Sequence, residues 1–473
     1  MGLLGIDLGT SSVKVVVIDE LGHTLSSSKG EYSVISEQPG WAESNPNEWW
    51  EATITAVRNA LAILEGVKIE GIGLSGQMHG VVLANSAGEF IRPAILWADN
   101  RAESVLEQYR NLPQATLNRL ANPLVPGMAG PILCWLAKYE QDIYNAARWA
   151  FQPKDWIRFC LTGVAAADPS DASATLLYDL IADEWLDDVI TELELDPQLL
   201  PPLLPSQAIA GTLTKQAAEV LGLPTGIPVA TGAADTAAAA LGTGLFDTEV
   251  VQFTMGTGAQ FLQLCNKPLP DSSGRTHLYR AATEASWYNM AAVQNGGLAL
   301  DWVRRVLNAS WDELYSSIET ISPGSDGLSF LPYLTRERSH HPNPASTGAF
   351  LGMRIDHRRE HFLHAALEGV AFGIRVALEA LSGTESITTL RMAGGGSVEP
   401  KWRQMLANIL GRELWIVDTP SASAQGAAIL GGIAAGIWAN TAATLHFAPS
   451  TQLAAIPDPS QKQLYDEIFA KYL

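Results

Sequence analysis

Residues 5–12 read Gly-Ile-Asp-Leu-Gly-Thr-Ser-Ser and lie between two apolar segments, the second of which spans Val13 to Ile18. An apolar run, a short polar turn and another apolar run predict a β-hairpin. The turn carries a carboxylate (Asp7), a glycine (Gly9) and a hydroxyl (Thr10). Backbone N–H groups and hydroxyls in such a turn suit phosphate oxygens, and a carboxylate suits a hydrated divalent cation. The alternative is an ordinary hairpin with a solvated turn.

A similar pattern recurs in the second half of the chain. The segment Val250-Val-Gln-Phe-Thr-Met-Gly-Thr-Gly-Ala-Gln-Phe-Leu-Gln-Leu264 places alternating apolar residues around a Gly-Thr-Gly turn that contains Gly256 and Thr257. This pattern also predicts a hairpin. Two hairpins of this kind, one in each half of the chain, favour a duplicated architecture that clasps one nucleotide.

Length and charge limit the classes of function. With 473 residues the chain exceeds one ordinary core, so we expect two large domains. The net charge of −20 argues against nucleic acid or an anionic membrane as the main partner. An anionic nucleotide is not excluded, because local N–H groups and a metal can hold it.

The three cysteines, Cys134, Cys160 and Cys265, are widely spaced. An odd count without a Cys-x-x-Cys pair predicts neither a disulfide framework nor a zinc site. We find no basic and then apolar leader and no run of about 18 apolar residues, so we expect a cytoplasmic protein without a membrane span. The sequence is compatible with a homodimer.

Strand-like and helix-like segments alternate along the chain, which predicts an α/β fold. Short strands dominate residues 3–35, and a helix follows over residues 48–64 behind Asn45-Pro46 as cap and first turn. Residues 69–74 read as a buried strand, and residues 81–85 as its continuation beyond a polar interruption.

Small residues at Leu241-Gly-Thr-Gly244 are typical of a hinge. We therefore place the two domains at residues 1–241 and 242–473. A final helix is expected at residues 460–473.

The segment Gly71-Ile-Gly-Leu-Ser-Gly-Gln-Met-His-Gly80 formally matches the dinucleotide fingerprint Gly-x-Gly-x-x-Gly. That motif must open a helix to place pyrophosphate at the helix N-terminus, whereas a β-rich Val-Val-Leu follows here. We interpret the segment as a strand end that exposes Gln77, Met78 and His79 into a cleft. The alternative is a packed methionine and a surface histidine.

In Ile95-Leu-Trp-Ala-Asp-Asn-Arg101 an apolar strand ends in Asp99 and Arg101, with Trp97 beside them. A polyol substrate needs several oriented donors and acceptors and an apolar wall, and this set supplies both. The alternative is a solvated strand end.

In Val229-Ala-Thr-Gly-Ala-Ala-Asp235 an apolar strand leads through small residues to one carboxylate, and an alanine-rich helix follows. Asp235 is either the N-cap of that helix or a general base that faces a cleft. Small neighbours would let a substrate approach the carboxylate closely.

Two glycine-rich segments precede expected helices, Asn295-Gly-Gly297 and Arg391-Met-Ala-Gly-Gly-Gly396. Glycines let a flat adenine or a phosphate approach the backbone closely. The alternative is a flexible loop.

Some familiar chemistries are missing from the sequence. It contains no Gly-Lys dipeptide and therefore no P-loop, and no Gly-x-Ser-x-Gly elbow, which weakens a hydrolase interpretation. His357, His361 and His364 share one face of an expected helix. Without a further ligand set we interpret them as a surface patch rather than a zinc site.

Taken in order, these segments resemble the FGGY family of carbohydrate kinases, whose two-domain fold is of the actin/hexokinase/heat-shock-ATPase (ribonuclease H-like) type with an interdomain cleft. The family's C-terminal signature is complete here, as Gly348-Ala-Phe-Leu-Gly-Met353, seven residues, and His361-Phe-Leu-His-Ala-Ala-Leu-Glu368. Four segments look like the xylulokinases of the family: Ser75-Gly-Gln-Met-His-Gly80, Pro153-Lys-Asp155, Leu161-Thr-Gly163 and Phe330 to Arg338. Residues 98–101 and 274–276 are similar to gluconate kinases.

The resemblance implies a role for each matching residue. Asp235 would be the catalytic base, and Asp7 and Asp235 would lie near Mg²⁺. The sugar would be bound by Met78, His79, Asp99 and Asp235. The nucleotide ATP would be bound by Gly9, Thr10, Gly256, Thr257, Gly297, Gly395 and Gly396.

Three positions depart from the family pattern. Ile132 stands where lysine is usual, Ala233-Ala234 follow Gly232 where further glycines are usual, and Gly258 stands where serine is common. None of these changes removes a catalytic group, but they bear on the identity of the sugar.

The resemblance therefore implies an ATP-dependent kinase that phosphorylates the terminal hydroxyl of a ketopentose, first of all D-xylulose, with gluconate or ribulose as alternatives. A different class of function on the same fold is a non-catalytic sugar sensor or an ATPase switch. The presence of Asp7, Asp235 and both turns favours the enzyme, because a sensor does not need the base.

Overall fold

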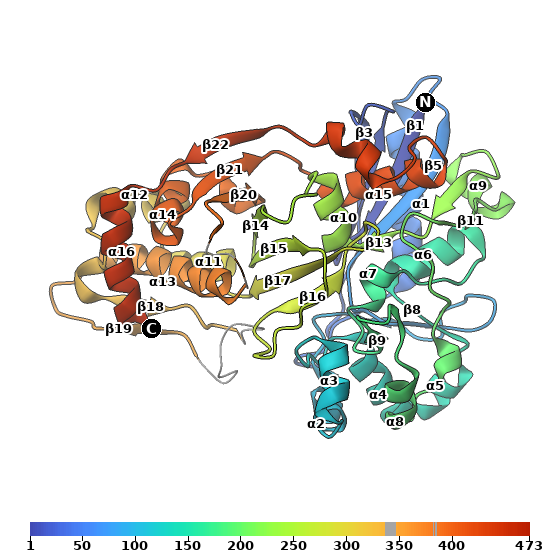
Figure 1. Ribbon diagram of the computed structural model, residues 1–473, viewed down its shortest axis with the longest axis horizontal. Helices are drawn as coiled ribbons and strands as arrows, with labels where there is room; N and C mark the ends of the chain where they lie inside the picture. The colour runs from blue at the N-terminus through green and yellow to red at the C-terminus, as the bar shows by residue number, and fades with distance from the viewer. Residues whose placement is uncertain (336–346, 382, 384–385) are drawn as a thin grey trace.

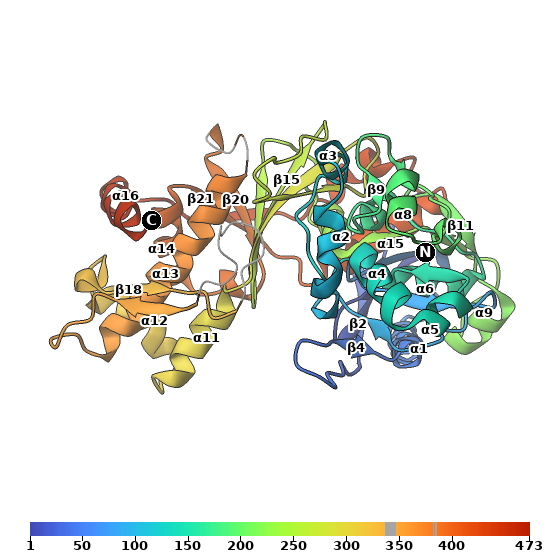
Figure 2. The same cartoon turned by 90° about the horizontal axis from the view of Figure 1, so that it is seen from below.

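The computed structural model describes residues 1–335, 347–381, 383 and 386–473, and these form two lobes (Figure 1). Each lobe is built on a mixed sheet, which has seven strands among the described residues. The two-lobed α/β architecture agrees with the expectation from the sequence. The view from below shows the lobes side by side, with the strands β14 to β17 of the second lobe nearest the first (Figure 2).

The first sheet contains the predicted N-terminal hairpin. Its strands are β1 (Gly2–Leu8), β2 (Ser12–Ile18), β3 (Thr24–Glu31), β5 (Ile69–Gly76), β11 (Ile209–Thr212), β12 (Pro228–Ala230) and β13 (Ala233–Ala234). Strand β1 pairs with β2 in antiparallel and with β5 in parallel orientation, and β13 adds to β5 in parallel.

The second sheet repeats this plan. Its strands are β14 (Val251–Met255), β15 (Ala259–Cys265), β16 (His277–Arg280), β17 (Trp287–Val293), β20 (Thr389–Ala393), β21 (Glu413–Val417) and β22 (Thr451–Ala455). Strand β14 forms an antiparallel hairpin with β15 and pairs in parallel with β20, as β1 does with β2 and β5. The duplication inferred from the two turns is therefore present in the strand order.

Opposite faces of the first sheet bind different helices because side chains alternate along each strand. Leu4, Ile6 and Leu8 share a core with α1 (Pro46–Ala62) and α6 (Pro153–Thr162). On the other face lie α10 (Asp235–Gly242) and α15 (Ala422–Ala434). Helix α1 begins as predicted, with the Asn45 side chain accepting from the Asn47 N–H.

Helix α15 lies directly on the backbone of the first sheet. A Cβ added at Gly5 would lie 1.9 Å from the Ala424 carbonyl oxygen, and one added at Gly73 only 1.7 Å from that of Ala427. Only glycine permits this approach. The chain thus returns to the first lobe after β21, so the predicted domain 242–473 includes a helix that packs on the first sheet.

The second lobe is covered by α11 (Gly297–Val306), α12 (Trp311–Thr320), α13 (Arg359–Ala380), α14 (Pro400–Leu410) and the predicted terminal helix α16 (Pro459–Tyr472). Helix α13 is apolar and long enough to cross a membrane, but most of it is buried as the central helix of this lobe.

The histidines near the start of α13 correct one expectation. His361 and His364 are 5% and 1% exposed, so they belong to the interior rather than to a surface patch. The His364 ring Nδ1 lies 2.9 Å from the Ser325 hydroxyl, which also donates to Glu368. Local hydrogen bonding therefore satisfies the buried imidazole.

Residues 81–85 correct another expectation, because β6 (Val82–Ala84) pairs with β8 (Trp149–Phe151) in a small separate sheet instead of extending β5. Besides short 3₁₀ helices, the remaining described elements are β4 (Glu43–Ser44), β7 (Ala94–Ile95), α2 (Leu106–Arg110), α3 (Gln114–Leu120), α4 (Ala129–Tyr139), α5 (Gln141–Ala146), α7 (Pro169–Ala172), β9 (Tyr178–Asp179), β10 (Glu184–Trp185), α8 (Asp187–Glu192), α9 (Lys215–Leu221), β18 (Ser329–Leu331) and β19 (Ala349–Leu351). The three cysteines are unpaired, as expected.

Candidate active site

Three parallel strands of the first sheet, β1, β5 and β13, end at one edge. In the register of the sheet, Leu8 of β1 and Ala234 of β13 both pair with Gly76 of β5. The next residues, Gly9 and Asp235, are therefore brought together although 226 positions separate them in the sequence (235 − 9). Ligands of α/β sheets bind outside the carboxyl ends of parallel strands, and this is such an edge.

The first turn is held from three other segments. The Gly9 carbonyl accepts hydrogen bonds from the Tyr32 hydroxyl at 2.5 Å and from the Gln77 side-chain amide at 3.1 Å. The Trp97 indole N–H donates to the Thr10 hydroxyl at 3.0 Å. The Gly9 N–H donates within the turn to the Ser12 carbonyl at 3.0 Å, so the N–H of the next residue, Thr10, is the one that would contact an anion.

Two carboxylates lie at this edge. The Asp7 carboxylate accepts from the Ser75 hydroxyl at 3.0 Å. Burial raises the pKa of Asp7, against the lowering effect of Ser75 and of the Lys14 charge. Burial and, after it, the charge of Asp7 raise the pKa of Asp235 to about 7, against hydrogen bonds from Thr236. Each carboxylate thus resists ionisation in the free protein.

Asp235 does not cap its helix. It is the first residue of α10, the N-cap residue is Ala234, and no side-chain capping bond is formed. This removes the main structural alternative for Asp235. A carboxylate with a pKa near neutrality, at a strand end and beside a second carboxylate, has the properties of a general base.

The same two carboxylates fit a magnesium ion. Their donors are oxygens, which Mg²⁺ prefers, and a divalent cation would offset the repulsion between them. Among the described residues no group of three or more His, Cys, Asp or Glu side chains is placed to hold a metal. Such a sparse donor set suits Mg²⁺, which commonly keeps several waters and is bound by one or two carboxylates and by substrate phosphates.

The predicted sugar residues Met78 and His79, and Gln77 beside them, are not exposed into a cleft. They are only 2%, 7% and 9% exposed, which corrects that expectation. The second lobe covers them, because the Tyr288 hydroxyl of β17 lies 4.0 Å from the Met78 sulfur. The His79 ring Nδ1 lies 2.8 Å from the Ala174 carbonyl oxygen.

Asp99 is also buried. Its carboxylate accepts from the Ala42 N–H at 2.7 Å and pairs with Arg101 through two guanidinium nitrogens at 2.8 and 2.9 Å. The Arg101 guanidinium also pairs with Glu43 and stacks on Trp41, 3.6 Å from the ring centroid. The Asp99 side chain is not exposed, so its contact with a sugar stays a prediction.

The predicted nucleotide residues of the second lobe line one pocket of about 640 Å³. They are Gly256, Thr257, Gly297, Gly395 and Gly396. The Gly297 N–H donates to the Gly256 carbonyl at 3.1 Å, which joins the turn to the start of α11. A Cβ at Gly297 would lie 2.4 Å from that carbonyl oxygen, so this position requires glycine.

Trp97 connects the two turns. It donates to Thr10 of the first lobe, and it lines a cavity of about 300 Å³ together with Gly256, Thr257 and Gly258 of the second lobe. The second turn thus lines a cavity whose wall includes Trp97, the residue that holds Thr10 of the first turn.

Sequence reasoning missed two groups of residues. Trp311 and Tyr315 of α12 line the nucleotide pocket with their rings stacked, and their spacing of four positions on a helix was an available signal. A buried ionic cluster around Lys154 was visible only as the quoted segment Pro153-Lys-Asp155. Glu337 and Arg338 of another quoted segment lie outside the described residues.

Comparison with known proteins agrees with this geometry. Residues 2–242 match the N-terminal domain of the FGGY family of carbohydrate kinases and residues 251–435 match its C-terminal domain. The xylulose kinase of Bacillus subtilis is 31% identical over 440 residues, which cover 92% of this chain and 88% of that protein. The gluconokinase of the same organism is 29% identical over 450 residues, covering 92% and 88%.

A solved structure is also similar. The crystal structure of a "xyloylose kinase" from Brucella ovis superposes with a TM-score of 0.93 at 33% identity, covering 100% of this chain and 98% of that chain. The chain belongs to the FGGY family of carbohydrate kinases and is an ATP-dependent sugar kinase with the two-domain actin/hexokinase-like fold.

Proposed function

We propose that this kinase transfers the γ-phosphate of MgATP to the terminal hydroxyl of D-xylulose, with Asp235 as the general base. The observation that carries the proposal is the position of Asp235. It lies at the strand edge beside the Asp7 turn, and burial and the charge of Asp7 raise its pKa to about 7. A base poised near the working pH can accept the hydroxyl proton while the oxygen attacks phosphorus.

The remaining residues of the site position the phosphate groups and neutralise their charge. We assign the Gly9-Thr10 and Gly256-Thr257 turns to the phosphate oxygens, through the N–H groups of Thr10 and Thr257. The N–H groups of Gly9 and Gly256 donate within the turns, to the carbonyls of Ser12 and Gly258. Mg²⁺, held by Asp7 and Asp235, would supply charge neutralisation to the transferring phosphoryl group. Closure of the lobes around the space at Trp97 would exclude water, which competes as an acceptor.

The charge of the sugar region supports a neutral substrate. Gluconate carries a carboxylate, which favours a cationic partner such as arginine. The Arg101 guanidinium is already paired with Asp99 and Glu43, and its side chain is only 1% exposed. Met78 and Tyr288, which meet across the lobes, are uncharged at neutral pH. The names of the xylulose kinase relatives add support, and the gluconokinase relative keeps gluconate as the alternative.

The test is a panel of sugars with ADP release as the measurement. We expect the highest kcat/KM with D-xylulose, a lower one with D-ribulose and a much lower one with D-gluconate under saturating MgATP. A higher kcat/KM for D-gluconate than for D-xylulose would overturn the substrate assignment and leave the assignment as a sugar kinase intact. Absence of ADP release with every sugar would favour the sensor. The homodimer and the cytoplasmic location stay predictions, which light scattering and cell fractionation address.

A further inference from the structure

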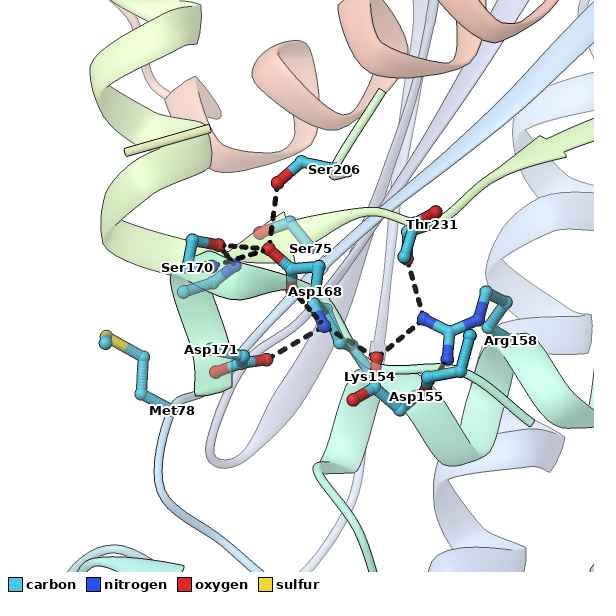
Figure 3. Close-up of polar contacts among 12 residues, drawn as sticks. Ser75, Met78, Lys154, Asp155, Arg158, Asp168, Ser170, Asp171, Ser206 and Thr231 are labelled. Carbon is cyan, nitrogen blue, oxygen red and sulfur yellow. Dashed lines mark hydrogen bonds and ion pairs between the residues drawn. The ribbon is translucent and has the colours of Figure 1, made fainter. Parts of the chain in front are cut away.

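The first lobe contains a fully buried ionic cluster that the chemistry above does not use. We call it the Lys154 cluster, and Figure 3 shows its members together with Ser170, Ser206 and Thr231. It consists of Lys154, Asp155, Arg158, Asp168 and Asp171, whose side chains have no exposure to solvent.

Ion pairs join all five side chains. The Lys154 ammonium lies 2.6 Å from the Asp155 carboxylate, 2.7 Å from that of Asp168 and 3.0 Å from that of Asp171. Arg158 pairs with Asp155 at 2.6 Å. Burial opposes the charge of Lys154, but the three carboxylates outweigh it and raise the pKa of that ammonium group.

Such a cluster is a costly way to stabilise a fold. Removing charges from water costs several kcal/mol per ion, and well-packed apolar residues of similar volume are often as stabilising. Stabilisation of the fold therefore does not by itself explain the cluster, whereas its contacts with other parts of the chain indicate a second role.

Those contacts converge on residues 231–234, which lead directly into Asp235. Arg158 donates to the Thr231 carbonyl at 2.7 Å. The Ser170 hydroxyl accepts from the Ala234 N–H at 2.9 Å. The same hydroxyl donates to the Asp168 carboxylate at 2.5 Å, and that carboxylate is paired with Lys154.

The Ser170 hydroxyl is thus a bridge between the cluster and the last residue before Asp235. Because the hydroxyl donates to a carboxylate, its oxygen is polarised and becomes a better acceptor. Strand β13 contains only Ala233 and Ala234, so its pairing with β5 fixes only two residues of the segment.

We propose that the Lys154 cluster, through Asp168 and the Ser170 hydroxyl, positions the backbone that presents Asp235 to the reacting hydroxyl. Ser170 is then a positioning residue of the phosphoryl transfer. The inference rests on the proposed role of Asp235, since a fixed backbone matters only if that carboxylate must be accurately placed.

The chain offers a matched control for this bridge. The Ser206 hydroxyl donates to the same Asp168 oxygen at 2.8 Å and is 4% exposed, while Ser170 is fully buried. Ser206 is joined to the segment by its backbone, as its carbonyl accepts from the Gly232 N–H at 3.0 Å, while its hydroxyl donates to Asp168. Ser206→Ala therefore removes an equal hydroxyl from the cluster but leaves the backbone contacts of residues 231–234.

The experiment compares wild type, Ser170→Ala, Ser206→Ala and Asp235→Asn in one ADP-release assay, in which the sugar and MgATP are each varied while the other is saturating. We expect Ser170→Ala to lower kcat about tenfold with both KM values within about twofold, because a small displacement of a catalytic group reduces turnover rather than binding. We expect Ser206→Ala to stay within about twofold of wild type in all constants.

Amide hydrogen exchange gives a second measurement that does not depend on activity. In Ser170→Ala the amide of Ala234 should exchange faster than in wild type, and in Ser206→Ala it should not. Ser170→Thr, which keeps the hydroxyl, should restore both kcat and protection. Thermal unfolding is measured for all variants, so that a loss of turnover in Ser170→Ala through general unfolding is recognised.

The outcomes separate the two proposals. Equal effects of Ser170→Ala and Ser206→Ala on kcat, or unchanged exchange at the Ala234 amide in Ser170→Ala, would overturn the positioning role of Ser170. Neither result would contradict the role of Asp235 as general base. If Asp235→Asn keeps wild-type turnover, the base itself is wrong and the positioning role falls with it.

Discussion

Replacing Asp7 with asparagine should move the pH dependence of sugar phosphorylation toward acid. If Asp235 is the base, kcat/KM of wild type falls below the Asp235 pKa of about 7, where the carboxyl is protonated. Asp7 contributes to that high pKa through its charge, after the larger effect of burial. Removing the charge therefore lowers the pKa and extends activity to lower pH.

The expected shift of the Asp235 pKa follows from the spacing of the strands in the first sheet. Strands β1 and β13 both flank β5, so Asp7 and the start of α10 are about 10 Å apart at a strand spacing of about 4.8 Å. Two charges at about 10 Å repel by about 1.7 kcal/mol at an effective dielectric constant of about 20. This energy corresponds to about one pH unit, so we expect a midpoint near pH 6 in Asp7→Asn.

The assay is kcat/KM for MgATP between pH 5 and 9, because this constant reports the enzyme before MgATP binds, in which Asp7 and Asp235 repel each other without a cation between them. Asp7→Asn also weakens the metal site, so its absolute rate falls and only the midpoint is compared. Asp19→Asn is the control, because it removes one negative charge just beyond the far end of β2 and keeps the oxygen that accepts from Leu21 and His23. An acid midpoint that is equal in wild type and Asp7→Asn would refute the reasoning.

Three other changes test separate parts of the site. Asp235→Asn should lower turnover by about 10²–10⁴-fold while calorimetry still detects ATP binding, and a variant with more than about a tenth of wild-type turnover would exclude the role. His79→Ala loses the contact with the Ala174 carbonyl, so the sugar KM should rise about 2- to 10-fold with the ATP KM unchanged, and the reverse pattern would assign His79 to the nucleotide. Gly297→Ala forces a Cβ against the Gly256 carbonyl, so the ATP KM should rise about tenfold in initial-rate measurements, whereas Gly373→Ala, whose Cβ has room, should leave it unchanged.

The elements that local pattern governs were predictable from the sequence. Both glycine turns were recognised by the change from alternating apolar residues to polar and small ones, and α1 by Asn45 and Pro46. Asp235 was recognised as unusual because it is a single charge in an apolar segment. In each of these segments the determining residues are close together in the sequence.

The errors arose where distant segments decide the environment. Gln77 and His79 read as a polar strand end, but β16 and β17 of the second lobe cover that region, so they are buried. His361 and His364 look like surface residues until their respective partners Asp326 and Ser325 are known. Residues 81–85 have strand character, but only the tertiary fold gives them β8 as partner.

The seating of α15 on Gly5 and Gly73 has a consequence for how the protein is made. Leu3, Val16 and Ile18 lie in the core that α15 completes through Ala424 and Ala428. During synthesis this apolar face stays uncovered until residues 422–434 have left the ribosome, when nine-tenths of the 473 residues have been made. A fragment that ends at the predicted boundary at residue 241 would leave this apolar face exposed to water and would therefore tend to aggregate. The two lobes are therefore interdependent in folding, and a core that begins with β1 is completed only by a helix about 400 residues further along the chain.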